Sequence, residues 1–440
     1  MTKTTKQLRR SFAAVGLMAA GVAGGGLAAS GLTAGHAVAE EVLFWSTQAR
    51  PVEEAQGVRD LVLPGAGVEV DFSPQDQGPF FTRIQAELEA GTGTIGVIGG
   101  LHGEFPVIED DLVDLTDVLD GLDGVSVSEA FVELGRLGSD EQKYLPWMQA
   151  TYIMAANRQA LDYLPEGADI DALTYDELVE WAATLEEETG SPKFGLPAGP
   201  RGLIHRFVQG YLYPSFTDSM VTEYRSDEAE AMWETVRDLW SHTSMASTQY
   251  NFMQEPLLSD DVWVAWDHSA RLQDAFNQRP DDFVAFPAPI GPTGLGFMPV
   301  VAGIGIPATA PDPDAARTLV AHLMQPETQV ATLRATSFFP VVDVDLPDDL
   351  PAAVLASGPA IAAQSGSEHA NPGLLPVGLG DLGGRFNKVY SDTFERILLA
   401  GQDIRTVLDS EAGTLRSIME DAGAPCWAPD ESGDETCPVD

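Results

Sequence analysis

The stretch "GTGTIGVIGG" contains three glycines with the spacing Gly91-x-Gly93-x-x-Gly96, a pattern that can bind the pyrophosphate of a dinucleotide. That chemistry requires a strand before the glycines and a helix after them, so that the helix N-terminus faces the phosphates. Here the order is reversed, because apolar residues at helical spacing fill 79–90 and a short apolar strand is predicted at 94–98. The glycines therefore end a helix and lead into a strand, and we expect no cofactor.

Motifs for other chemistry are missing from the sequence. It contains no G-x-S-x-G nucleophile motif, no H-E-x-x-H zinc motif and no phosphate-loop lysine. His102 and Glu104 are close in sequence, but no third ligand stands at a fixed spacing, so we expect no metal. A pair of carboxylates among the 67 acidic residues would suffice for glycoside hydrolysis. We expect a protein that is not an enzyme, and a hydrolase is the alternative.

Residues 1–39 are typical of an export signal. Basic residues, including the adjacent Arg9 and Arg10, precede a long uncharged stretch that closes on an A-x-A pattern ending at Ala39. The arginine pair, followed by Ser11 and Phe12, resembles a twin-arginine signal, and a Sec signal is the alternative. Glycine dilutes the apolar stretch and no cysteine follows it, so we expect cleavage after Ala39 and no membrane insertion. The mature chain is then periplasmic or extracellular.

The cysteine content and the charge fit an exported protein. Cys426 and Cys437 are the only cysteines, and export favours a disulfide that closes the acidic C-terminal tail, residues 426–440. The chain has 24 basic and 67 acidic residues, a net charge of −43. Such a surface excludes nucleic acid and anionic membranes as partners. A halophilic or salt-tolerant source would explain it, because salt screens the repulsion between the carboxylates.

The predicted elements alternate between strands and helices, which indicates an α/β fold, and the length after Ala39 is too great for one core. One predicted helix begins with a capping box of Thr174 and Glu177, and another begins at Asp312-Pro313. Their predicted apolar faces are Leu178, Trp181, Ala182 and Leu185 in the first, and Ala316, Leu319, Val320 and Leu323 in the second. Residues 141–157 are predicted as strands that break at Pro146.

Several stretches resemble the extracellular solute-binding proteins of ABC importers, in the carbohydrate-binding group that includes the maltose-binding protein. They are "EVLFWSTQ", "FFTRIQAELEAGTGTIGVIGG", "KYLPWMQATYIMAANRQAL", "VWVAWDHSARL" and "TSFFPVV", and they stand in the family's order. The likeness runs over most of residues 41–420. The family often has an aspartate just before the strand at 94–98, where this chain has Thr94.

The resemblance implies a periplasmic-binding-protein-like fold, in which two α/β lobes are joined by a hinge of several crossings and enclose the ligand cleft. We expect the crossings near 147–152, 296–301 and 337–341. Lobe one would hold 40–148 and 300–337, and lobe two would hold 149–299 and 338–425.

The resemblance also implies a function: the chain captures a sugar or polyol by hinge closure and delivers it to the permease of an ABC importer. Sugar binding needs flat aromatic rings against C–H groups and planar polar groups that pair with hydroxyls. Residues of these types are predicted in the loops after the strands and at the crossings. The expected ligand-binding residues are Trp45, Gln48, Gln77, His102, Glu104, Trp147, Gln149, Trp266, Asp267, Arg271 and Phe338.

Two other functions stay open from the sequence. One is an exported carbohydrate-active hydrolase. The other is a binder of a different solute, such as glycerol phosphate, an osmolyte or a peptide. An anionic ligand requires basic groups, and Arg201 and Arg271 are the candidates for that role. In each case we expect a monomer.

Overall fold

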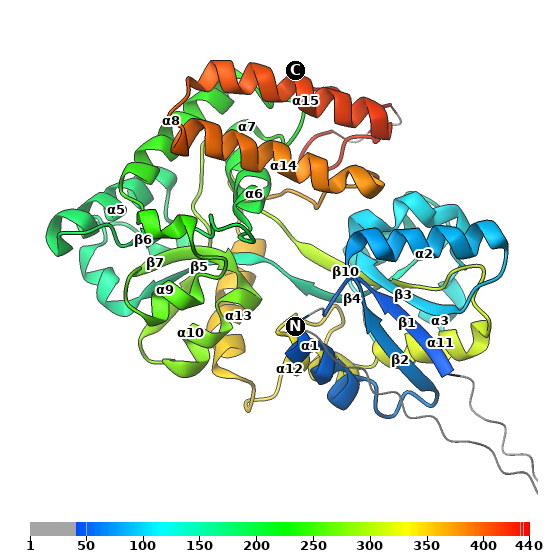
Figure 1. Cartoon of the computed structure of the whole chain (residues 1–440). Helices are drawn as coiled ribbons and strands as arrows, with labels where there is room; N and C mark the ends of the chain where they lie inside the picture. The colour runs from blue at the N-terminus through cyan, green and yellow to red at the C-terminus, as the bar shows by residue number, and fades with distance from the viewer. Residues whose placement is uncertain (1–40, 50, 432, 434) are drawn as a thin grey trace, which may run out of the picture. The chain divides into compact units, whose positions relative to one another are not determined.

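The computed structural model describes residues 41–49, 51–431, 433 and 435–440. The predicted export signal, residues 1–39, and the cleavage after Ala39 lie outside the described residues. The described residues belong to one unit of the chain, which contains two main β-sheets and many helices (Figure 1). The predicted α/β class is confirmed.

The first main sheet has five strands and is formed mostly by the N-terminal part of the chain. Their order is β2 (Glu69–Pro74), β1 (Glu41–Ser46), β3 (Ile95–Leu101), β10 (Val300–Gly305) and β4 (Leu145–Ala150). β1 pairs parallel with β2 and β3, whereas β10 pairs antiparallel with β3 and β4. β3 and β10 are buried almost throughout, as strands covered on both faces are, and this explains their continuous apolar runs.

Gly91, Gly93 and Gly96 lie where a helix ends and a strand begins. α2 (Gln77–Ala90) ends at Gly91, which has a left-handed φ of 66°, and β3 begins four residues later. Gly96 then lets β3 lie close to β1, since a Cβ at this position would be 2.8 Å from Cγ1 of Val42. The prediction of a helix end followed by a strand is confirmed.

β4 contains the proline that we expected to break it. Pro146 lies inside β4, opposite Gly303 of β10, next to a shift in the register of the pair. A proline has no N–H to donate and is tolerated on edge strands and at such irregularities. β4 is an edge strand of its sheet, so the expected break at Pro146 is wrong and the strand continues to Ala150.

The second main sheet has the strand order β6 (Phe194–Gly195), β7 (Val264–His268), β5 (Tyr152–Asn157) and β8 (Phe283–Phe286). β5 pairs antiparallel with β7 and β8, and every residue of β5 is buried. A separate small sheet pairs β9 (Leu295–Phe297) with β11 (Ala370–Pro372). The chain thus builds two sheets from interleaved segments of sequence.

Three segments meet where the two main sheets join. Thr151 alone separates β4 from β5, and its hydroxyl donates to the carbonyl of Met298, 2.9 Å away, between β9 and β10. Gln149 and Phe339 exchange two backbone hydrogen bonds, of 2.9 and 2.6 Å. The chain changes sheet at these positions, and the lobe boundaries drawn near them remain a prediction.

The capping signals predicted from the sequence are present. In α5 (Tyr175–Thr189) the N–H of Glu177 donates to the hydroxyl of Thr174, and the N–H of Thr174 donates back to the Glu177 carboxylate, at 3.2 and 2.8 Å. Asp312 accepts from the first N–H groups of α11 (Pro313–Leu323). The predicted apolar faces of both helices are buried.

The other helices pack against the sheets or against one another. They are α1 (Val52–Gly57), α3 (Thr116–Asp120), α4 (Glu129–Arg136), α6 (Ile204–Phe207), α7 (Tyr213–Thr217), α8 (Asp227–Ser241), α9 (Gln254–Leu258), α10 (Gln273–Gln278), α12 (Pro326–Thr336), α13 (Ala352–Ser365), α14 (Gly383–Phe394) and α15 (Ile404–Ala422). α14 and α15 run side by side (Figure 1). In the described part of the chain, no helix is both long enough and apolar enough to cross a membrane.

The predicted disulfide is present. It joins Cys426 to Cys437, whose Cα atoms are 4.5 Å apart. The bridge follows directly on α15, so the acidic tail is closed into a loop at the end of the last helix.

Candidate ligand-binding site

Glu104 is the centre of a polar cluster at the carboxyl ends of the first three strands. Its carboxylate accepts from the hydroxyl of Thr47 at 2.7 Å, from the amide of Gln77 at 3.1 Å and from the backbone N–H of Leu101 at 2.7 Å. Thr47 and Gln77 follow β1 and β2, and Leu101 is the last residue of β3. The parallel ends of these strands meet at the same edge of the sheet. Glu104 is buried, so these bonds hold its charge in a fixed position.

A cavity of about 180 Å³ opens beside this cluster. One side is made by the strand-end loops of the first sheet and by α2. The other side is made by α6, by the segment 375–380 and by the first two turns of α14. The lining residues are Thr47, Gln48, Gln77, Phe81, Leu101, Gly103, Glu104, Arg206, Leu375, Pro376, Leu379, Gly380, Gly383 and Asn387.

Arg206 brings a positive charge to the side opposite the strand-end loops. Its guanidinium donates to the amide oxygen of Gln209 at 3.0 Å, and Gln209 donates to the amide oxygen of Asn387 at 3.1 Å. Burial lowers the pKa of Arg206, while the negative charge of Glu104 opposes that shift. An arginine stays protonated at neutral pH, so the cavity has a cation on one side and a carboxylate on the other.

The cavity also has an apolar part of its lining. Phe81 presents an aromatic ring that packs edge-on against Phe80, with the ring centroids 5.2 Å apart. Leu375, Pro376 and Leu379 add aliphatic surface on the opposite side. A ring face beside planar amide, carboxylate and guanidinium groups can hold a small ligand that has both C–H and hydroxyl groups.

The structure brings three of the predicted ligand-binding residues together in this cavity: Gln48, Gln77 and Glu104. His102 lies just behind them. It is buried, and its Nδ1 is 2.8 Å from the hydroxyl of Tyr144. Burial lowers the pKa of His102 to about 4, so the ring is neutral at pH 7. His102 therefore supports the loop after β3 from the protein interior.

Trp45 and Trp147 lie in the interior of the first sheet and are not among the residues that line the cavity. The indole N–H of Trp45 points to the carbonyl of Phe80, 3.4 Å away. Trp147 is fully buried, and its ring lies 5.3 Å from that of Phe44. We expected both rings at the cleft, but helices cover both faces of the sheet, so rings at these positions pack into its core.

Trp266 and Asp267 lie in β7 and are fully buried. The ring of Trp266 stacks on Tyr152 at 4.8 Å. Asp267 accepts from the backbone N–H groups of Met253 and His268, at 2.9 and 2.7 Å. Burial raises the pKa of Asp267 to about 6, and the charge of Arg271 opposes this shift. These side chains belong to the interior of the second sheet.

Arg271, Gln149 and Phe338 lie at three other places. Arg271 donates to the carbonyls of Arg201 and Asn251, at 3.3 and 3.1 Å. The amide of Gln149 donates to the carbonyl of Pro340 at 2.8 Å. The ring of Phe338 lies 5.4 Å from that of His268, at the third segment of the junction. Arg271 and Gln149 therefore hold backbone carbonyls in place, and Phe338 packs at the junction of the sheets.

Sequence reasoning missed the residues that complete the cavity. Arg206 follows directly on His205, in the stretch "GPRGLIHRF" in which we considered Arg201 and His205. Asn387 lies on an amphipathic helix whose polar face gives no sign of which residue faces a ligand. The segment 375–380 lacks a periodic pattern. Proximity to Glu104, which lies far away in sequence, is the only signal that identifies them.

The described residues hold no cluster of three or more His, Cys, Asp or Glu side chains that is able to bind a metal ion.

Several solved structures of binding proteins share this fold. UgpB from Mycobacterium tuberculosis in complex with glycerophosphocholine aligns with a TM-score of 0.67 and 17% identity, over 87% of this chain and 98% of that one. The sugar-binding protein MalE from Xanthomonas citri aligns with a TM-score of 0.66 and 14% identity, over the same shares of the two chains. The cyclic alpha-maltosyl-1,6-maltose binding protein from Arthrobacter globiformis aligns with a TM-score of 0.63 and 16% identity, over 87% of this chain and 99% of that one. At these identities the likeness shows the fold alone.

Sequence comparison gives the family. No curated protein sequence matches this chain. Residues 64–360, more than half of the chain, match the bacterial extracellular solute-binding proteins. The chain belongs to that family, and the predicted resemblance and fold are confirmed. Membership implies an exported protein that binds a solute.

Proposed function

We propose that this protein captures a sugar or polyol and delivers it to the permease of an ABC importer. The observation that supports the proposal best is the cavity beside Glu104. Planar polar groups line it from opposite sides, since Gln77 and Glu104 follow strands of the first sheet and Arg206 and Asn387 come from α6 and α14.

These groups suit a hydroxylated ligand that is bound without reaction. A sugar hydroxyl both donates and accepts, so it pairs with a carboxylate or amide oxygen and with an amide or guanidinium N–H at the same time. An unpaired buried hydroxyl costs about 1–3 kcal/mol, and two-sided lining removes that cost. Because both sides contact the ligand only when they are close together, binding shifts the population towards the closed form.

We also propose that the protein is exported and works outside the cytoplasm. The first 39 residues have the features of a twin-arginine signal, and family membership implies export. We propose cleavage after Ala39 and a monomer in the periplasm or outside the cell. The partner would be the permease, which recognises the closed form.

A thermal-shift screen of the purified protein tests the proposal. The panel contains monosaccharides, disaccharides and polyols, and a binder raises the melting temperature in proportion to the logarithm of its concentration. The same compounds are assayed for turnover. A shift without turnover supports the proposal. Consumption of a glycoside by the protein would establish the hydrolase instead.

A second candidate ligand is a glycerol phosphodiester or glycerol phosphate. Arg206 in the cavity wall favours it, because a guanidinium binds phosphate in a bidentate manner. One structure of the same fold holds glycerophosphocholine. Glycerophosphocholine and glycerol phosphate therefore belong in the screen, with Arg206→Met as the deciding variant. If the ligand is a phosphate ester, this variant loses binding almost completely, whereas a neutral sugar loses only one of several hydrogen bonds.

A further inference from the structure

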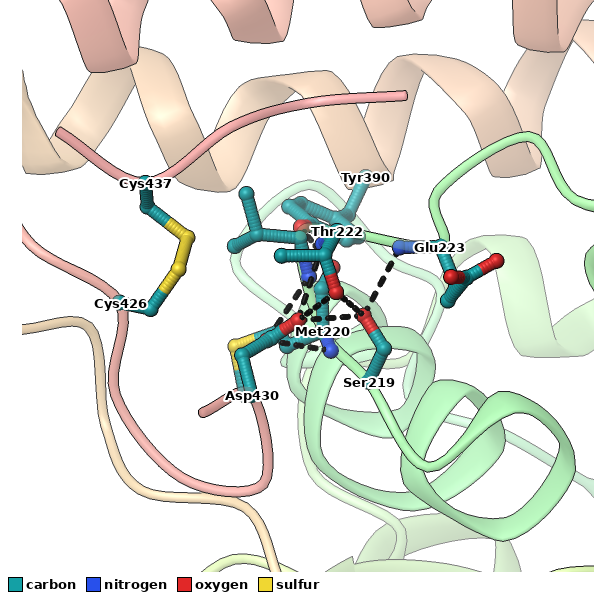
Figure 2. Close-up of a disulfide and its surroundings, with 9 residues drawn as sticks. Ser219, Met220, Thr222, Glu223, Tyr390, Cys426, Asp430 and Cys437 are labelled. Carbon is teal, nitrogen blue, oxygen red and sulfur yellow. Dashed lines mark hydrogen bonds between the residues drawn. A yellow bond between two sulfur atoms is a disulfide. The ribbon is translucent and has the colours of Figure 1, made fainter. Parts of the chain in front are cut away.

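The disulfide-closed tail is held by a buried carboxylate. Asp430 is 4% exposed, and it accepts hydrogen bonds from the turn 219–222 (Figure 2). One of its oxygens accepts from the hydroxyl of Ser219 and from the N–H and hydroxyl of Thr222, at 2.6, 2.9 and 2.6 Å. The other accepts from the N–H groups of Met220 and Val221, at 2.7 and 3.0 Å. This carboxylate anchors the tail to a turn about 210 residues earlier in the chain.

The anchored tail in turn holds one wall of the cavity. The carbonyl of Ala428, two residues before Asp430, accepts from the N–H of Leu374 at 2.8 Å. Leu375 is the next residue and lines the cavity. A Cβ placed at Gly378, further along the same wall, would lie 3.6 Å from Cβ of Ala424 at the base of the tail. The tail thus holds the segment 374–380 at Leu374, and Ala424, two residues before the tail, lies close to Gly378 in the same segment.

The tail also supports the helix that brings Asn387 to the cavity. The ring of Trp427 lies 5.5 Å from that of Phe386 in α14. Further along α14, the hydroxyl of Tyr390 donates to the carbonyl of Met220, in the same turn that binds Asp430, at 2.7 Å. Tail, turn and helix therefore form one connected support behind the cavity.

The supported wall meets the strand-end loops directly. A Cβ at Gly103 would lie 1.9 Å from the carbonyl oxygen of Pro376, so only glycine permits this contact. Gly103 is the residue before Glu104. A displacement of the segment 374–380 would therefore change the distance between the two sides of the cavity at the place where the central carboxylate lies.

We infer that the tail loop, through Asp430 and the Cys426–Cys437 bridge, is a positioning element that holds the segment 374–380 as a fixed wall of the ligand site and thereby sets ligand affinity. The first half of this inference concerns the protein without ligand. The second half rests on the proposed function.

Hydrogen exchange of the ligand-free protein tests the first half. In Asp430→Ala the amides of 374–380 should exchange about tenfold faster or more, because they lose the support behind them. Glu431→Ala removes the same charge from the next residue, which is exposed, and it should leave the exchange of 374–380 unchanged. A double variant, Cys426→Ser with Cys437→Ser, keeps Asp430 but opens the loop, and it should show the same faster exchange if Asp430→Ala does not fold.

Affinity for the saccharide with the largest thermal shift tests the second half, and it should fall about tenfold in Asp430→Ala and stay unchanged in Glu431→Ala. The inference is overturned if 374–380 exchanges at the wild-type rate while 220–222 exchanges faster. Faster exchange with unchanged affinity also overturns it. If exchange quickens but no compound binds even the wild type, the wall is held as inferred and it is the proposed function that fails.

Discussion

At the scale of single residues, the site depends on a charged group that the protein already holds by hydrogen bonds. Glu104 accepts from Thr47, Gln77 and Leu101, so its position is fixed before any ligand arrives. Such a carboxylate loses little conformational freedom on binding. The neutral His102 behind it adds a packed support that carries no competing charge at pH 7.

Replacing the central carboxylate should weaken binding more than it weakens the fold. In Glu104→Gln the ligand loses a charge-assisted hydrogen bond, and we expect affinity to fall about 10- to 100-fold. Isothermal titration with the best compound of the screen measures this. Glu89→Gln, an exposed change on α2, is the matched control and should bind as the wild type does. Equal affinity in both variants would remove Glu104 from the site.

His102 should make stability depend on pH. Its pKa is about 4 in the folded protein against an ordinary 6.5, so between these values the unfolded chain binds a proton that the folded chain does not. The free energy of unfolding therefore rises from pH 4 to 6.5. His268, with a pKa of about 3, adds to this rise, and Asp267, raised to about 6, opposes it between pH 3.8 and 6.

His102→Gln should remove about 2–3 kcal/mol from the difference in unfolding free energy between pH 4 and 6.5, because glutamine does not titrate. Urea unfolding at the two values measures it. His369→Gln changes an exposed histidine and should leave the difference as it is. An unchanged difference in His102→Gln would show that the histidine is not buried in neutral form.

At the scale of elements, close approach of strands decides where glycine is required. β3 lies against β1 only because Gly96 has no Cβ, whereas Gly413 on α15 is exposed and a Cβ there would meet no atom within 4 Å. A change from glycine to alanine should therefore have opposite effects on the free energy of unfolding at the two positions.

Gly96→Ala should destabilise the protein by about 1–3 kcal/mol, since the new Cβ would lie 2.8 Å from Cγ1 of the buried Val42. Gly413→Ala should stabilise it by about 0.5–1 kcal/mol, since alanine restricts the unfolded chain and favours the helix. Chemical denaturation of both variants checks the pair. Two shifts of the same sign would contradict the packing of β3 on β1.

At the scale of the whole molecule, the net charge of −43 acts on every part of the fold. Self-repulsion of this size destabilises the compact state and is screened by salt. Most of the few basic residues of the described part form ion pairs, such as Arg405 with Asp227 and Glu230.

The melting temperature should therefore rise with NaCl, most steeply at low concentration, because the Debye length falls from about 30 Å at 0.01 M to about 10 Å at 0.1 M. Sucrose at equal osmolality is the control for general solvent effects, and it should give a smaller, linear rise. A melting temperature that stays level or falls between these salt concentrations would show that the carboxylates do not repel one another appreciably.

The sequence by itself determined the local elements and the family. Thr174 with Glu177 and Asp312 with Pro313 mark helix starts, because caps involve residues within one turn of each other. Gly91 marks the end of α2 for the same reason. The disulfide was predictable for another reason, because each of the two cysteines has no alternative partner.

Only the tertiary structure decided which side chains share the cavity. Arg206 and Asn387 lie about 100 and 280 residues from Glu104, and no local pattern relates positions so far apart. Periodicity shows that a residue is buried, but not what it is buried against, so Trp147 and Trp266 were expected at the ligand and lie in the cores of the two sheets. The joining of two sheets from interleaved segments places a guanidinium opposite a carboxylate, and that arrangement exists only in the folded chain.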